Sequence, residues 1–95
     1  LPRPDVPITT IRNVQKSSPK SSTLYLEGEV GKQVPFLDSR AYELKDSTGS
    51  IWVVTKEKPP QPQDQVLLKA KVQHKNIRVG GKTVKEVYVE EQQRL

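Results

Sequence analysis

The 95-residue sequence has no cysteine, no methionine, one histidine and few aromatic residues: one Trp, three Tyr and one Phe. Without cysteine, the chain has no disulfide, no thiolate zinc site and no cysteine nucleophile. A single histidine excludes a multi-histidine metal site and leaves little material for acid–base chemistry. No apolar run approaches the roughly 18 residues that span a bilayer. Because Leu1 is not a methionine, we expect the chain to be a piece of a longer protein.

Charge is the most uneven property of the sequence. Sixteen Lys and Arg residues face eleven Asp and Glu residues, which leaves a net charge of +5. The excess is concentrated in residues 65–89, where Glu86 is the one acid among Lys69, Lys71, Lys75, Arg78, Lys82 and Lys85. Such a basic segment is where a phosphate backbone would be attracted. The alternative is that these lysines keep strand edges from pairing with other chains.

The chain is long enough for one domain at most, with a thin core. Prolines at positions 2, 4 and 7 favour extended backbone, so residues 1–22 are predicted to be an extended N-terminal segment or linker. Within it, residues 8–14 are expected to add a short edge strand. Residues 23–90 form the predicted domain, and residues 91–95 a C-terminal tail.

Apolar and polar residues alternate along several segments, which is the pattern of half-buried strands. Residues 23–34 place Leu24, Leu26, Gly28 and Val30 on one face, with glycines that indicate a bend. Residues 40–46 and 50–56 form a predicted hairpin, in which Tyr42, Leu44, Ile51 and Val53 face inward. Its turn, at residues 46–49, is capped by the Asp46 side chain, and Gly49 is expected to take a positive φ.

The second half of the sequence continues this pattern. Residues 65–73, 76–79 and 82–89 are predicted strands, with a turn at His74 to Asn76 and a hairpin turn at residues 80–81. The spacing of Val84 and Val87 breaks the alternation and indicates a bulge. The prolines of residues 58–62 exclude a helix there, and no segment has helical periodicity. The class is all-β; a small barrel and a small sandwich both fit, and the bent first strand favours the barrel.

Residues 41–54, AYELKDSTGSIWVV, resemble the second and third strands of OB-fold domains of the tRNA-anticodon-binding and nucleic-acid-binding type. Tyr42, Leu44, Asp46, Gly49, Ile51 and Val53 match the family pattern. The resemblance implies a five-stranded OB-fold Greek-key barrel. The usual helix between strands three and four is missing, as in minimal bacterial variants. The resemblance also implies a ligand-binding face on the outside of the second and third strands.

The strand alternation predicts which side chains such a face would present. Trp52, with Tyr25 or Tyr88, would stack on bases, whereas Arg40, Lys45, Lys69, Lys71 and Arg78 would hold phosphates. Trp52 has an alternative role, in which it packs over the open end of the core. Glu27, Glu29 and Glu43 lie on or beside the face and oppose tight non-specific phosphate binding.

These residues predict a non-catalytic, monomeric module that binds single-stranded DNA or RNA without cofactor or metal. The competing hypothesis is a protein-interaction or envelope-associated module that binds a peptide or another domain of its own longer chain. A third hypothesis is that the module binds an oligosaccharide or a small ligand. A nucleic-acid role implies the cytoplasm, and a signal sequence upstream of Leu1 would imply an envelope or secreted protein. No phosphate-binding loop and no serine–histidine–acid arrangement is present, so catalysis is not expected.

Overall fold

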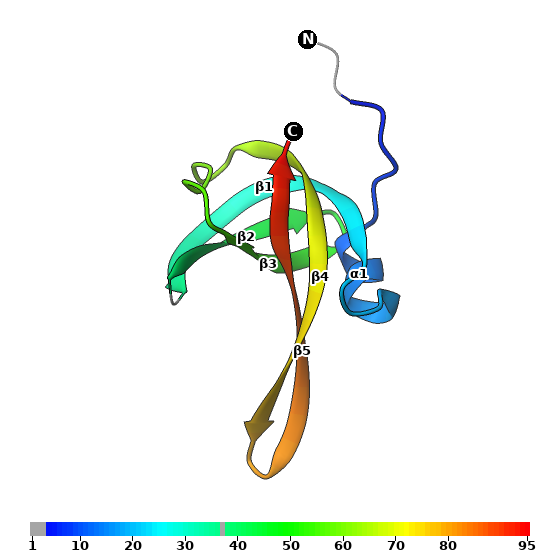
Figure 1. The fold of residues 1–95 in the computed structure, drawn as a ribbon, viewed down its shortest axis with the longest axis vertical. Helices are drawn as coiled ribbons and strands as arrows, with labels where there is room; N and C mark the ends of the chain where they lie inside the picture. Colours follow the sequence, from blue (N-terminus) through cyan, green and yellow to red (C-terminus); the bar gives the residue numbers. More distant parts are fainter. Residues whose placement is uncertain (1–3, 37) are drawn as a thin grey trace.

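The computed structural model describes residues 4–36 and 38–95; residues 1–3 of the predicted linker therefore lie outside the described part. The described residues form one short helix and five strands, shown in Figure 1: α1 (Ile11–Ser17), β1 (Thr23–Phe36), β2 (Ser39–Asp46), β3 (Gly49–Thr55), β4 (Gln65–Val79) and β5 (Lys82–Arg94).

The five strands form a single sheet that closes on itself as a barrel, in the order β1-β2-β3-β5-β4. All neighbours are antiparallel except β3 and β5, which are parallel. β1 serves two partners, because its first half pairs with β4 and its second half with β2. The register of β1 against β2 shifts between Val30 and Gln33, around Gly31. The all-β barrel predicted from the sequence is confirmed, and its bend lies at a glycine as expected.

Gly28 allows β1 and β2 to approach closely where β1 changes partner. A Cβ atom at this position would lie 2.3 Å from the carbonyl oxygen of Lys45, far inside van der Waals contact. Any side chain would therefore push the two strands apart. This steric requirement accounts for a glycine on the inward-facing side of a strand, where larger apolar residues otherwise pack.

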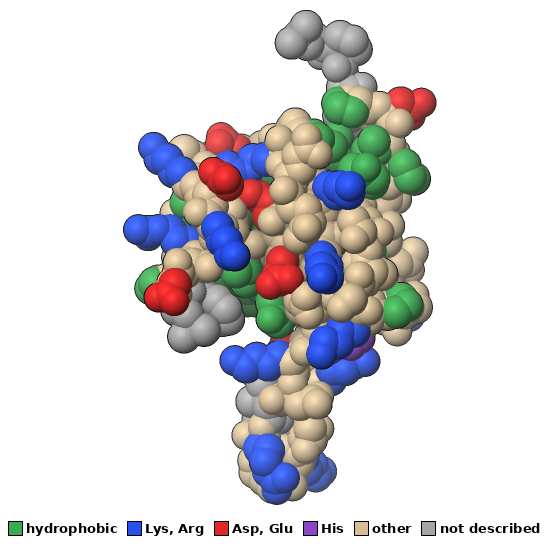
Figure 2. All heavy atoms as spheres, in the orientation of Figure 1, with side chains coloured by type: hydrophobic (Ala, Val, Ile, Leu, Met, Phe, Trp, Pro, Cys, Tyr) green, Lys and Arg blue, Asp and Glu red, His purple; other side chains and the backbone are tan. Residues whose placement is uncertain are grey.

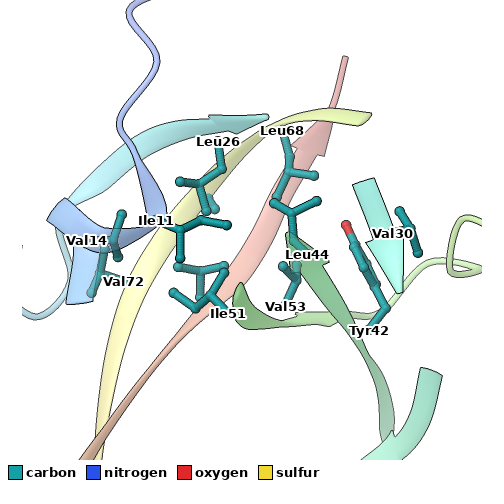
Figure 3. Packing of buried hydrophobic residues seen from close by; sticks show 12 residues of the cluster. Ile11, Val14, Leu26, Val30, Tyr42, Leu44, Ile51, Val53, Leu68 and Val72 are labelled. Carbon is teal, nitrogen blue, oxygen red and sulfur yellow. The ribbon is translucent and has the colours of Figure 1, made fainter. Parts of the chain in front are cut away.

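The core fills the closed sheet and one of its ends (Figure 3). Most of the inward positions that alternation predicts are buried: Leu26, Val30, Tyr42, Leu44, Ile51, Val53, Leu68, Ala70, Val72 and Val89. Leu24, Val66 and Val87 are partly buried against this core. Leu67 and Ala41 are exceptions to the alternation, because each lies between two neighbours on the inward-facing side of its strand and yet is buried. The backbone amide of Leu95 donates a hydrogen bond to the carbonyl oxygen of Leu67 at 2.8 Å, so Leu95 lies against Leu67.

The predicted edge strand at residues 8–14 is wrong for most of its length, because α1 begins at Ile11. Strand-like contact is limited to an isolated parallel bridge between Ile8 and Tyr25, where the amide of Thr9 donates to the carbonyl of Tyr25 at 2.9 Å. Thr10 caps the helix by accepting a hydrogen bond from the amide of Asn13. Ile11 and Val14 lie three residues apart, so they share one helix face, and both are buried in the core. α1 therefore covers one end of the barrel.

The Asp46 side chain joins this helix to the hairpin turn between β2 and β3. Its Oδ2 accepts from the amide of Ile11 at 2.9 Å, and its Oδ1 accepts from the amides of Thr48 and Gly49 at 2.7 and 3.1 Å. The predicted side-chain cap of the turn is thus confirmed. The positive φ expected at Gly49 is not found, since among the described glycines only Gly80 and Gly81 have one. Those two form the predicted hairpin turn.

β4 and β5 are longer than predicted. His74 does not begin a turn but lies within β4, paired with Val87. The bulge expected between Val84 and Val87 is also absent from the described ladder, which runs there without interruption; the register shift lies instead between Lys69 and Ala70. Val84 consequently faces the side opposite Val87 and is exposed. β5 continues through Arg94, into the predicted tail.

The connection from β3 to β4, residues 56–64, contains neither helix nor strand, as its prolines predict. It is nevertheless fastened to β1. The amide of Gln63 donates to the carbonyl of Val30 at 2.7 Å, and the amide of Val30 donates to the carbonyl of Asp64 at 2.9 Å. Two backbone hydrogen bonds therefore hold this loop against the bend in β1.

We predict that Asp46→Asn destabilises the protein by about 1–3 kcal/mol at neutral pH, because a charged acceptor of several hydrogen bonds is lost. Partial burial works against ionisation, but the hydrogen bonds from Thr48, Ile11 and Gly49 prevail and lower the pKa of Asp46. A lowered pKa adds stability that is present above the unfolded-state pKa of about 4 and lost as pH falls through the folded-state value.

Urea unfolding at pH 7 and at acidic pH measures this effect. Asp5→Asn removes the same charge before the first element and is the matched control. The wild type should lose stability on acidification and D46N should lose less. Equal acid sensitivity in the wild type and D46N would contradict the role given to Asp46.

Candidate functional site

Trp52 lies on the outside of the barrel, as the alternation predicts. Its neighbours along β3, Ile51 and Val53, are buried in the core, whereas Trp52 itself is 39% exposed. Within the β2–β3 ladder it is paired with Glu43. The indole is therefore not enclosed by the core, and part of its aromatic surface faces solvent.

Tyr88 is the aromatic residue that the sheet brings beside Trp52. Val53 of β3 pairs in parallel with Val89 of β5, and Trp52 and Tyr88 each immediately precede one member of this pair. Since both valines point inward, both aromatic residues point outward, each one residue before the point where β3 and β5 begin to pair. Tyr88 is half-buried. The predicted combination of Trp52 with Tyr88 thus matches the observed topology.

Glu43 and Lys45 cover the next part of this face, on β2. A Cβ atom at Gly31 would lie 2.5 Å from Oε1 of Glu43 and 2.9 Å from Cε of Lys45, so both side chains lie over the glycine of β1. Arg40 is at the other end of β2, paired with Thr55. Lys45 therefore lies on the Trp52 face together with the Glu43 carboxylate, whereas Arg40 is on the side of β2 that carries Tyr42 and Leu44, at its exposed end, so the two predicted cations do not flank Trp52 together.

Tyr25, Lys69 and Lys71 are on a different part of the barrel. Tyr25 pairs with Lys69, and Lys71 pairs with Thr23, in the β1–β4 ladder. Tyr25 is in the half of β1 that pairs with β4, whereas Trp52 is on β3 and pairs with Glu43 of β2, which itself pairs with the other half of β1. The sequence-based grouping of Tyr25 with Trp52 is not observed.

Arg78 lies far from both groups, on a hairpin that leaves the barrel. β4 pairs with β1 only as far as Lys71, and β5 pairs with β3 only at Val89 and Glu90. Residues 74–87 therefore pair only with one another, and they form the twisted projection at the bottom of Figure 1, here called the arm. The described side chains of Lys75, Arg78, Lys82 and Lys85 are exposed along it, with Glu86 as its one acid.

A buried polar cluster, missed by the sequence analysis, lies where β2, β3 and β5 meet. The Glu91 carboxylate, only 3% exposed, accepts hydrogen bonds from the Tyr42 hydroxyl and, at 2.8 Å, from the Thr55 hydroxyl. Arg94 donates to both oxygens of the same carboxylate, at 3.1 and 2.9 Å. Its guanidinium also lies 5.9 Å from the centre of the Tyr42 ring. We call this set the seam cluster.

The seam cluster is electrostatically self-contained. Burial, reinforced by the hydrogen bond to Glu91 and by the charge of that carboxylate, raises the pKa of Tyr42 well above its ordinary value. Partial burial of Arg94 acts in the opposite sense, but the Glu91 carboxylate prevails and raises the pKa of Arg94. Both groups therefore keep their protons. Both carboxylate oxygens of Glu91 already accept hydrogen bonds. The cluster therefore stabilises the junction of the three strands and is not arranged as an acid–base site.

An open groove runs above this cluster, between the end of β3 and the end of β5. It is lined by Val54 to Lys58 on one side and by Glu90 to Arg94 on the other. The groove exists because β3 stops at Thr55 while β5 continues, paired only with β4. Arg94 reaches across its floor and donates to the carbonyl of Lys58 at 3.0 Å.

Among residues 4–36 and 38–95, no group of three or more His, Asp or Glu side chains is placed to hold a metal ion. No helix in the described part of the chain is long and apolar enough to cross a membrane. No protein-family model matches the sequence, and no curated protein matches it. The geometry of the exposed aromatic residues and of the arm is therefore what bears on function.

We predict that Tyr42→Phe destabilises the fold by about 1–3 kcal/mol, because the buried Glu91 carboxylate loses one of its donors while the core keeps its shape. Tyr25→Phe, which removes a hydroxyl from a half-buried ring on the outer face, is the control and should change stability by less than about 0.5 kcal/mol. Chemical denaturation measures both. Similar small losses in the two variants would show that the seam cluster contributes little.

Proposed function

We propose that this chain is a non-catalytic OB-fold module that binds single-stranded nucleic acid across the outer face of β2, β3 and β5. The observation that carries the proposal is the exposed Trp52 beside Tyr88. The strand order and the closed five-stranded sheet support the OB-fold assignment. In that fold the ligand face lies on the second and third strands, which are the strands that carry Glu43 and Trp52 here.

Stacking is the interaction that this face offers. A base stacked on an aromatic side chain contributes roughly 1–3 kcal/mol, and it does so for every base because each has a π-face. An indole that is 39% exposed has surface available for such contact. Stacking requires unpaired bases, so the face suits a single strand rather than a duplex.

A cation at the edge of the face supports the same assignment. Lys45 lies on the outer side of β2, two positions from Glu43, which pairs with Trp52, so a strand that crosses Trp52 passes near Lys45. Glu43 and Glu90 lie beside this path, and the Glu90 carboxylate accepts from the Gln73 amide at 2.8 Å. These acids limit non-specific attraction on the face itself. Affinity is therefore expected to depend on stacking as well as on charge.

We predict that a mixed-sequence oligonucleotide quenches Trp52 emission, with an affinity that falls steeply as salt rises. Replacing Trp52 with leucine should weaken binding about 10-fold in anisotropy measurements with a labelled single strand, whereas phenylalanine should retain part of the affinity. Val84→Ala is the matched control, because it removes exposed apolar surface from the arm rather than from the face.

The absence of quenching at low salt with micromolar oligonucleotide would defeat the proposal. So would equal weakening by W52L and V84A, since that would leave no specific role for the indole. A backbone-amide chemical-shift titration with the same oligonucleotide should move signals from β2, β3 and β5 first. Shifts confined to the groove between β3 and β5 would instead favour a peptide-like ligand.

A further inference from the structure

The arm is a two-stranded ribbon that stands away from the rest of the protein. The molecule measures 51 × 27 × 22 Å along its principal axes, and the arm and the N-terminal segment extend along the longest one (Figure 1). From its base at the barrel to the turn at Gly80, the arm spans about seven residues of β4, or roughly 23 Å. Lys and Arg side chains are spread along this projection in Figure 2.

The two faces of the arm differ in charge. Val72 and Val89 are paired and point into the core, so the pairs that follow on that side, at every second position, continue the inner face. These pairs contribute Val87, at the base of the arm, and five polar residues, here called the polar row: His74, Asn76, Arg78, Thr83 and Lys85. The polar row contains no carboxylate. Glu86 is on the opposite face, paired with Lys75.

The arm differs from the barrel face in having no aromatic residue. Residues 74–87 contain no Trp, Tyr or Phe, so they offer no ring for an unpaired base to stack on. They offer cations and hydrogen-bonding side chains on a narrow, protruding ribbon. The major groove of B-form DNA, about 12 Å wide, accommodates a two-stranded β-ribbon, whereas the deep, narrow major groove of duplex RNA does not.

We propose that the arm binds duplex DNA, with the polar row facing the sugar-phosphate backbone and groove, while the barrel face binds an adjoining single strand. The preferred ligand of the whole chain is then a junction between double-stranded and single-stranded DNA. The single-stranded half of this ligand rests on the proposed function above, and the duplex half rests on the arm alone. The competing explanation, that the arm's lysines only prevent edge pairing, predicts no duplex affinity.

Anisotropy with three labelled probes tests the arm: a blunt DNA duplex of about 16 base pairs, roughly one and a half turns, the corresponding single strand, and the corresponding RNA duplex. Arg78→Ala/Lys85→Ala should weaken binding of the DNA duplex about 10-fold, and should reduce the slope of log K against log salt by about two. Arg12→Ala/Lys16→Ala removes the same charge from exposed positions of α1 and should change binding less than about 2-fold.

A comparison of two single-residue variants tests which face of the arm contacts the duplex. Lys85→Ala should weaken duplex binding more than Lys82→Ala, because the two lysines lie on opposite faces of one strand. The inference is overturned if the wild type does not bind the DNA duplex, if both double variants weaken it equally, or if the RNA duplex binds as tightly. Duplex binding that depends on the arm, without Trp52 quenching by the single strand, would support the arm site and defeat the single-strand proposal.

Discussion

The closure of the sheet between β3 and β5 is the constraint on which the rest of the structure depends. The parallel register comprises two residue pairs, Val53 with Val89 and Val54 with Glu90. Parallel pairing is slightly weaker per residue than antiparallel pairing, so two pairs are a weak closure. Glu91, the next residue of β5, accepts hydrogen bonds from Tyr42 on β2 and Thr55 on β3. Side chains therefore join three strands where the backbone ladder ends.

This closure also positions both surfaces for which a binding role is proposed. The parallel pair at Val53 and Val89 is what places Trp52 beside Tyr88 on the outside of the barrel. Before Val89, β5 has left β3 and pairs only with β4, and this separation creates the arm. At the other end of the barrel, Asp46 ties α1 to the β2–β3 turn. The ends of the barrel are thus fixed by contacts separate from the outer face that carries Trp52.

Much of this architecture could be predicted from alternation alone. The inward set that includes Leu26, Tyr42 and Leu68, and the outward orientation of Trp52, follow from period-two patterning. α1 could not be predicted, because two apolar residues three apart are too few to define a helical period, and a seven-residue helix is stable only through burial against the sheet. The continuous β4 was obscured by polar residues that face solvent on both sides of the arm.

The seam cluster was missed for a different reason. Glu91 and Arg94 sit in a run of polar residues near the end of the sequence, which is typical of a solvated tail. The available signal was Tyr42, because a tyrosine on the inward side of a strand must find a partner for its hydroxyl. The partner, Glu91, lies beyond residue 90 and is in position only because β5 extends further than predicted. Strand length, rather than strand existence, was therefore the property that the pattern left undetermined.

The distribution of charge explains why binding would be divided between two surfaces. Glu43 and Glu90 flank Trp52, so the barrel face has little long-range attraction for a polyanion, whereas the arm carries an excess of cations along a projection. Coulombic attraction acts over about a Debye length, whereas stacking acts only at contact. On the proposed function, the arm would therefore govern the approach of DNA and its dependence on salt. Trp52 would govern how long an unpaired strand stays bound.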